Sequence, residues 1–104
     1  MLFGLTMFPI GEGDSLRRPV AEVIDEIDRA GLQYQVTGME TVIEGDWDHV
    51  VPVIRDAERR LRKEHGRVFM LLTMDDNSCE TSRLRGSAAA VEQELGRHVP
   101  HVVE

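Results

Sequence analysis

The stretch Gln33-Tyr34-Gln35-Val36-Thr37-Gly38-Met39-Glu40-Thr41-Val42-Ile43-Glu44 decides the fold of this chain. Its β-branched residues favour extended strands, and Gly38 lies where a turn is needed between them. The pattern predicts a strand over residues 33–37 and a second strand over residues 40–44, paired as a hairpin. This hairpin divides the chain into two halves, each of which contributes further elements.

The first half contains a predicted strand and a predicted helix. Residues 2–8 are an apolar run that stops at Pro9, as expected for a buried strand. Residues 16–30 carry apolar side chains at helical spacing, and Gly31 is a typical helix stop. The first half therefore predicts a strand, a helix and the first strand of the hairpin.

The second half repeats this order. Asp46 is a good helix N-cap, Pro52 is expected to kink the helix or delay its start, and Gly66 ends it. Residues 67–75 are apolar on both faces, so we expect this strand in the middle of the sheet. An alanine-rich helix is predicted over residues 84–95.

Two strand–helix–strand units with a hairpin between them predict an α+β domain of the βαββαβ, ferredoxin-like kind. Right-handed crossovers place both main helices on one face of a four-stranded antiparallel sheet, with the last helix as an addition. We expect one domain over residues 1–96 and a C-terminal tail over residues 97–104. Because residues 2–8 are apolar on both faces and helices cover only one, the pattern also predicts a homo-oligomer.

Composition excludes several partners. The net charge of −7 and the pI of about 5.0 argue against nucleic acid and against an anionic membrane surface. The one cysteine, Cys79, rules out a disulfide within the chain. The apolar run at residues 1–10 is too short to span a membrane and has no basic leader, so we expect a cytoplasmic protein.

No metalloprotease, P-loop, Cys-x-x-Cys or Gly-x-Ser-x-Gly motif is present, so the sequence does not predict an enzyme. Candidate metal ligands are Cys79 with Asp75 and Asp76, and the pair His98 and His101 around Pro100. Cys79 is better interpreted as a loop or subunit-contact residue, and the two histidines as part of a C-terminal tail. We therefore predict no metal site.

Trp47 is the one tryptophan, and it lies among the carboxylates of Glu44, Asp46 and Asp48. These residues pack and cap a helix start, or they form an aromatic and acidic rim for a flat cation. Asp75, at the end of the last strand, either begins a loop or accepts hydrogen bonds from an amine. Thr6 and Thr41 add hydroxyls, or simply favour strands.

Five segments taken together resemble a known family. They are Phe8-Pro9-Ile10-Gly11-Glu12-Gly13-Asp14-Ser15-Leu16, then Val20-Ala21-Glu22-Val23-Ile24, Ala30-Gly31-Leu32, the stretch from Met39 to Val50, and the strand from Arg67 to Asp75. The stretch Thr41-Val42-Ile43-Glu44-Gly45-Asp46-Trp47-Asp48 is the most specific. In order and spacing, residues 2–95 resemble the small thiamine-binding proteins.

The resemblance implies a ferredoxin-like fold, commonly a dimer of dimers packed through the sheets, which binds thiamine or a related pyrimidine without catalysis. It implies thiamine as the ligand and no other cofactor. Carried onto this chain, the binding residues would be Thr6, Phe8, Thr41, Glu44, Trp47 and Asp75. The alternatives are a structural or regulatory oligomer without a small ligand and a small thiamine-salvage enzyme with Glu44 or Asp75 as general base.

The chain departs from the family pattern at three positions. It has Thr73 where members often have a basic residue, Asn77 where they often have arginine, and Gly4 where some have glutamate. Loss of basic groups would weaken the binding of phosphates. These departures from the family pattern therefore lead to the hypothesis that the site prefers unphosphorylated thiamine.

Overall fold

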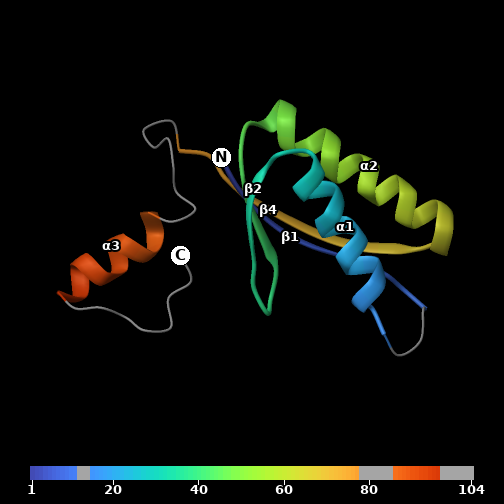
Figure 1. The fold of residues 1–104 in the computed structure, drawn as a ribbon, viewed down its shortest axis with the longest axis horizontal. Helices are drawn as coiled ribbons and strands as arrows, with labels where there is room; N and C mark the ends of the chain where they lie inside the picture. The colour runs from blue at the N-terminus through green and yellow to red at the C-terminus, as the bar shows by residue number, and fades with distance from the viewer. Residues whose placement is uncertain (12–14, 78–85, 97–104) are drawn as a thin grey trace.

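The computed structural model of the chain describes residues 1–11, 15–77 and 86–96. A four-stranded antiparallel sheet has the strand order β2-β3-β1-β4, and α1 and α2 pack on one of its faces (Figure 1). This arrangement confirms the predicted α+β, ferredoxin-like fold. The elements are β1 (Leu2–Pro9), α1 (Arg17–Arg29), β2 (Gln33–Val36), β3 (Thr41–Glu44), α2 (Trp47–His65), β4 (Val68–Asp75) and α3 (Gly86–Leu95).

The core lies between the sheet and the two helices. Alternate residues of β1 point toward the helices, as the period of two along a strand requires. They meet the apolar stripes of α1 and α2, which recur at helical spacing. The buried residues are Phe3, Leu5, Met7, Val23, Ile27, Ile43, Val50, Ile54, Ala57 and Leu61. Glycines with positive φ end both helices, at Gly31 and Gly66, as predicted.

Helix α2 starts as predicted, with Asp46 at its N-cap position, and not later, the alternative that Pro52 left open. The helix begins at Trp47, directly after Asp46, and continues through Pro52 to His65. Pro52 lies in the second turn and has no N–H, so the backbone hydrogen bond from residue 52 to the carbonyl of Asp48 is not made.

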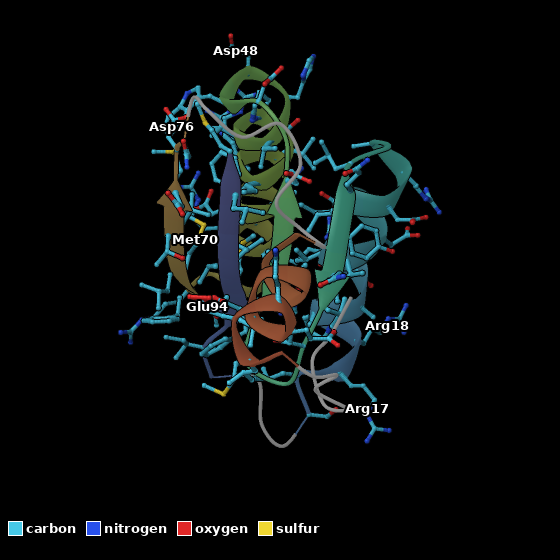
Figure 2. The ribbon with its side chains drawn as sticks, turned by 90° about the vertical axis from the view of Figure 1, so that its left-hand side faces the viewer. Arg17, Arg18, Asp48, Met70, Asp76 and Glu94 are labelled. Carbon is cyan, nitrogen blue, oxygen red and sulfur yellow. The ribbon has the colours of Figure 1, made fainter. Side chains whose placement is uncertain are left out.

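The strand β4 lies at an edge of the sheet, so the prediction of a central position for residues 67–75 is wrong. Figure 2 shows β4 at the margin, with Met70 beside it. Phe69, Met70, Leu71 and Met74 are all exposed. An apolar edge strand has the same two-sided pattern as a central one, and the pattern cannot separate the two.

The predicted extra helix is present as α3, which lies apart from α1 and α2 beyond the end of the sheet where β1 starts (Figure 1). Residues 97–104, predicted as a tail, are outside the described residues, as is Cys79. Among the residues that the structure describes, no helix combines the length and the apolar character that crossing a bilayer demands.

Candidate functional site: the open face of the sheet

The face of the sheet opposite α1 and α2 is here called the open face. In β1 it carries Leu2, Gly4, Thr6 and Phe8, because Phe3, Leu5 and Met7 point into the core. Strand pairing places residues of β4 beside these positions. The pairs are Leu2 with Asp75, Gly4 with Thr73, Thr6 with Leu71, and Phe8 with Phe69.

A cavity of about 240 Å³ lies on the open face around Gly4. It takes residues from β1, β3 and β4 and from the turn before β3, and its walls are largely apolar. Its lining residues are Leu2, Phe3, Gly4, Glu40, Val42, Thr73, Met74 and Asp75. Two carboxylates and one hydroxyl therefore border a small apolar hollow.

Gly4 lines this cavity, and the absence of a side chain there lets two polar groups approach the backbone of β1. A Cβ placed on Gly4 would lie 2.5 Å from Oε2 of Glu40 and 2.6 Å from Oγ1 of Thr73. Real Cβ atoms do not approach oxygen so closely. The Glu40 carboxylate and the Thr73 hydroxyl thus occupy the volume that a side chain of residue 4 would fill.

The backbone of Glu40 is fixed by the hairpin turn between β2 and β3. The Thr37 hydroxyl donates to the Glu40 carbonyl at 2.8 Å and accepts from the Glu40 N–H at 3.1 Å. The Thr37 N–H donates to the same carbonyl at 2.9 Å. Because these bonds fix the Glu40 backbone, the side chain starts from a defined point and reaches across to β1.

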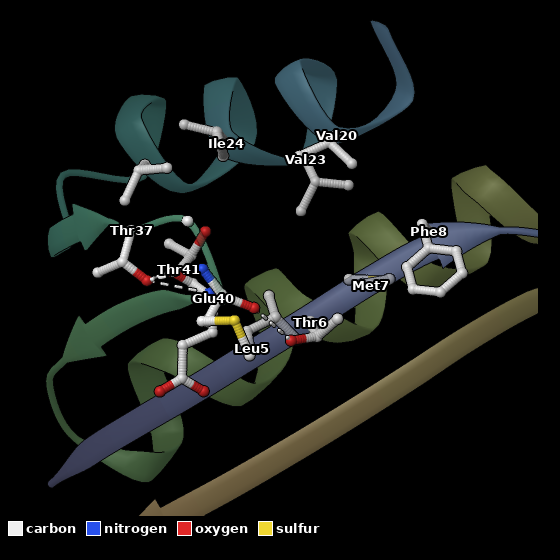
Figure 3. A pocket seen from close by; sticks show the side chains of 13 residues that line it. Leu5, Thr6, Met7, Phe8, Val20, Val23, Ile24, Thr37, Glu40 and Thr41 are labelled. Atoms are coloured by element: carbon white, nitrogen blue, oxygen red, sulfur yellow. Dashed lines mark hydrogen bonds between the residues drawn. The ribbon is translucent and has the colours of Figure 1, made fainter. Parts of the chain in front are cut away.

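A second cavity, of about 180 Å³, lies between β1, α1 and the hairpin (Figure 3). Pairing between β1 and β3 ends at Leu5 and Thr41, so the strands diverge beyond that point and leave a notch. The Thr6 hydroxyl crosses the notch and donates to the Met39 carbonyl at 3.3 Å. Figure 3 shows apolar side chains of α1 above it, among them Val20 and Ile24. Glu40 lines both cavities.

The structure brings four of the predicted site residues to the open face. Thr6 and Phe8 point there from β1, and the Phe8 ring lies 5.3 Å from that of Phe69. Glu44 and Asp75 lie on either side of Leu2, since both pair with it. These four residues share one surface, although they extend along most of the length of β1.

The other two predicted residues lie elsewhere. Thr41 pairs with Leu5, points toward the helices and is 8% exposed, so it lines the notch and not the open face. Trp47 begins α2 and packs against the core residue Phe3, with 6.3 Å between ring centroids.

Two polar residues of the Gly4 cavity were not among the predicted site residues. Glu40 precedes β3, and its reach across to β1 depends on strand pairing. Thr73 donates to the Gly4 carbonyl at 3.4 Å, a long bond. The signal in the sequence was Gly4 itself, because glycine within an apolar strand often marks a close approach of another group.

The resolved pKa shifts belong to the helical side of the molecule. A hydrogen bond to Arg18 is the largest cause that lowers the pKa of Glu22 on α1; burial opposes it, and a hydrogen bond to Arg60 lowers the pKa further. A hydrogen bond to Asp28 raises the pKa of Tyr34, whose hydroxyl donates to Oδ1 at 3.0 Å. These groups stabilise the helical layer and do not face the open-face cavity.

Metal binding finds no support in residues 1–11, 15–77 and 86–96, which contain no group of three potential ligands in reach of one ion. His98 and His101, the other candidate ligands, lie outside the described residues. The chemistry available at the open face is therefore that of carboxylates, hydroxyls and apolar surface. Such groups bind a flat ring that carries hydrogen-bond donors or positive charge.

Solved structures match this fold. The Methanocaldococcus jannaschii protein MJ1052 superimposes with a TM-score of 0.81 at 22% identity, over 88% of this chain and 95% of that one. The Thermotoga maritima protein TM0486, described as a candidate for thiamine biosynthesis or salvage, gives a TM-score of 0.75 at 18% identity, over 86% and 96% of the two chains. At these identities the likeness establishes the fold alone.

Sequence comparison establishes the family. The UPF0045 protein Mb1933 of Mycobacterium bovis is 31% identical over 98 residues, which are 93% of this chain and 96% of that protein. A sequence profile described as "Thiamine-binding protein" matches residues 3–92. The matched segment contains β1 from its second residue, β2 to β4 and both core helices. The chain therefore belongs to the thiamine-binding protein family.

Proposed function

We propose that this protein binds thiamine, or a related pyrimidine or thiazolium compound, without transforming it. Family membership supports the class of ligand. The observation that carries the proposal is the cavity at Gly4, where the carboxylates of Asp75, at the end of β4, and Glu40, in the hairpin turn, border a largely apolar hollow. Asp75 and Glu40 supply the negative charge, and Thr73 supplies a hydroxyl.

The size of the cavity limits what it holds. Pockets for drug-sized molecules are roughly 300–1,000 Å³, and this cavity is about 240 Å³. One ring of a two-ring ligand fits such a space, and the other ring would lie along the open face. The aminopyrimidine offers donors to carboxylates, and the thiazolium cation is attracted to aromatic faces such as that of Phe8.

The charge of the sheet favours an unphosphorylated ligand. None of the four strands contains lysine, arginine or histidine. Phosphate recognition commonly uses such residues, and here Asp75 and Glu40 would repel the phosphate. The proposal therefore predicts that thiamine binds more tightly than thiamine monophosphate.

The proposal includes a homo-oligomer in the cytoplasm. The exposed apolar residues of β4 support association, because a long apolar edge strand pairs readily with another chain. A dimer of dimers and the cytoplasmic location remain predictions from the sequence and the resemblance. Association through the sheets would bring further residues to the open face.

Calorimetric titration of thiamine and of thiamine monophosphate into the purified protein tests the proposal. We expect saturable binding of thiamine, weaker binding of the monophosphate, and weaker thiamine binding by Asp75→Asn. The matched control is Asp56→Asn on α2, which removes the same charge from the helical layer. Absence of heat with the folded wild-type protein would overturn the proposal. Mass spectrometry after prolonged incubation should recover thiamine unchanged, and turnover would favour the salvage enzyme instead.

A second candidate function is that of an assembly or regulatory protein without a small ligand. The exposed apolar surface of β4 favours it, because that surface serves association whether or not a ligand binds. The Asp75→Asn variant distinguishes these two functions. A variant that keeps its oligomeric state but loses thiamine binding supports the binding function.

A further inference from the structure

The position of Glu40 over Gly4 has a chemical consequence. The Glu40 carboxylate lies on the open face although Glu40 belongs to the hairpin turn, and it reaches the middle of β1. Figure 3 shows this side chain directed away from α1 and toward β1. A carboxylate is thus placed at the centre of the sheet by a residue that is not in a strand.

The carboxylate of Glu40 accepts no hydrogen bond from the described residues of the protein. Within residues 1–11, 15–77 and 86–96, the carboxylate of the half-buried Glu40 makes no hydrogen bond or ion pair, while its backbone groups bond to Thr37. The neighbouring Thr73 hydroxyl has one proton, which it donates to the Gly4 carbonyl. The carboxylate oxygens therefore have acceptor sites available for a ligand that brings hydrogen-bond donors.

We infer that Glu40 is the residue that selects the ligand, by accepting a hydrogen bond from the exocyclic amino group of a pyrimidine ring. Gly4 is required because any side chain at residue 4 would displace the carboxylate. The inference rests on the proposed function, and it names the recognised group and the residue that recognises it. The class of ligand is a planar nitrogen heterocycle with an amino donor.

The geometry also implies that the source of the carboxylate is interchangeable. The Cα–Cβ direction of residue 4 points at the place that Oε2 of Glu40 now occupies, 2.5 Å from the ideal Cβ position. A glutamate at residue 4 would therefore deliver its carboxylate to the same side of the sheet, provided that residue 40 leaves the space empty. The double variant Gly4→Glu/Glu40→Gly tests this exchange.

The experiment compares thiamine with oxythiamine, which has a carbonyl in place of the amino group and keeps the thiazolium ring. Titration calorimetry is done with the wild-type protein, Glu40→Gln, Gly4→Ala and the double variant, with Asp56→Asn as control. A hydrogen bond to a charged group changes affinity by about ten- to hundred-fold. We expect Glu40→Gln to lose that factor for thiamine and to lose discrimination against oxythiamine.

Gly4→Ala should weaken thiamine binding without any change of charge, because its methyl group displaces the carboxylate. The double variant should recover binding relative to Glu40→Gln. Circular dichroism and the melting temperature establish that each variant is folded.

The failures are distinguishable. If the wild-type protein binds thiamine and Glu40→Gln binds it equally well, this inference is overturned and the proposed function stands. Equal wild-type affinity for thiamine and oxythiamine would overturn it as well. If the wild-type protein binds no thiamine, the proposed function and this inference fail together.

Discussion

The guanidinium of Arg60 on α2 lies against the carboxylate of Glu22 on α1, with 2.9 Å between Nη1 and Oε2. Arg60 also pairs with Glu26 on α1 through its Nε atom. These contacts join residues 34 and 38 positions apart and connect the two helices that cover the core. They explain how a pair of charged helix faces holds together outside the apolar stripe.

Replacement of Arg60 should destabilise the domain. Arg60→Gln keeps much of the length of the side chain but removes the cation that pairs with Glu26 and Glu22, so that Glu22 is left with Arg18 alone. Partly exposed ion pairs contribute little individually, so we expect a loss of about 1 kcal/mol of unfolding free energy, measured by urea denaturation. Arg29→Gln is the control, since Arg29 pairs with Asp25 at the exposed surface of α1 alone. Equal losses of unfolding free energy in the two variants would show that the ion pairs between α1 and α2 contribute no more to stability than a surface ion pair within α1.

The pH dependence of stability should contain a contribution from Glu22. Hydrogen bonds to Arg18 and Arg60 lower the pKa of Glu22 in the folded protein below its ordinary value of 4.5. The ionised carboxylate therefore stabilises the folded state above that value, and the contribution disappears as the pH falls through the folded pKa. The melting temperatures of wild type and Glu22→Gln should differ near pH 7 and converge in acid. A constant difference across this range would contradict the assignment.

The aromatic pair Phe8 and Phe69 should be coupled energetically. The two residues are cross-strand neighbours on the open face, with 5.3 Å between ring centroids and a tilt of 33°. Such pairs contribute about 0.5–1.5 kcal/mol beyond the burial of their area. A double-mutant cycle of Phe8→Leu and Phe69→Leu should give a coupling energy in this range. Additive effects of the two changes would mean that the rings do not interact in solution.

A charge on β4 should prevent association. Leu71 is 55% exposed on this edge strand, so Leu71→Arg should leave the fold intact while it disrupts contacts with another chain. We expect a wild-type oligomer and a variant monomer in sedimentation velocity experiments. Ala21→Arg adds the same charge on the exposed surface of α1 and should leave the oligomer unchanged. A monomeric wild-type protein would contradict the proposed assembly.

The patterns along the chain predicted the elements closely. The helical spacing in residues 16–30 became α1 at Arg17–Arg29, and the predicted hairpin became β2 and β3 within one residue at each end. These boundaries depend on local properties, namely the period of apolar residues and the glycines that end helices. The order of the elements then predicted the fold class, a four-stranded antiparallel sheet with both main helices on one face.

The candidate site was predicted only in part. Thr6, Phe8, Glu44 and Asp75 share the open face, whereas Thr41 and Trp47 belong to the helical side. Faces of a strand follow from the parity of residue numbers, but the face that one strand shares with another follows from their register. Thr41, Glu44 and Trp47 are close together in the sequence, but their motif does not predict the register of β3 against β1.

The sequence by itself determined the element types, their order and the apolar character of β1 and β4, since each follows from residues close together in the chain. Only the tertiary structure decided that β4 is an edge strand and that the Glu40 carboxylate lies over Gly4. Both facts join segments more than 30 residues apart, and the free energies that choose such pairings come from packing and strand register. The spacing of residues along the chain does not predict those interactions. Gly4 could therefore be noted in the sequence as a glycine within a strand, but the sequence did not predict that the Glu40 carboxylate occupies the space beside it.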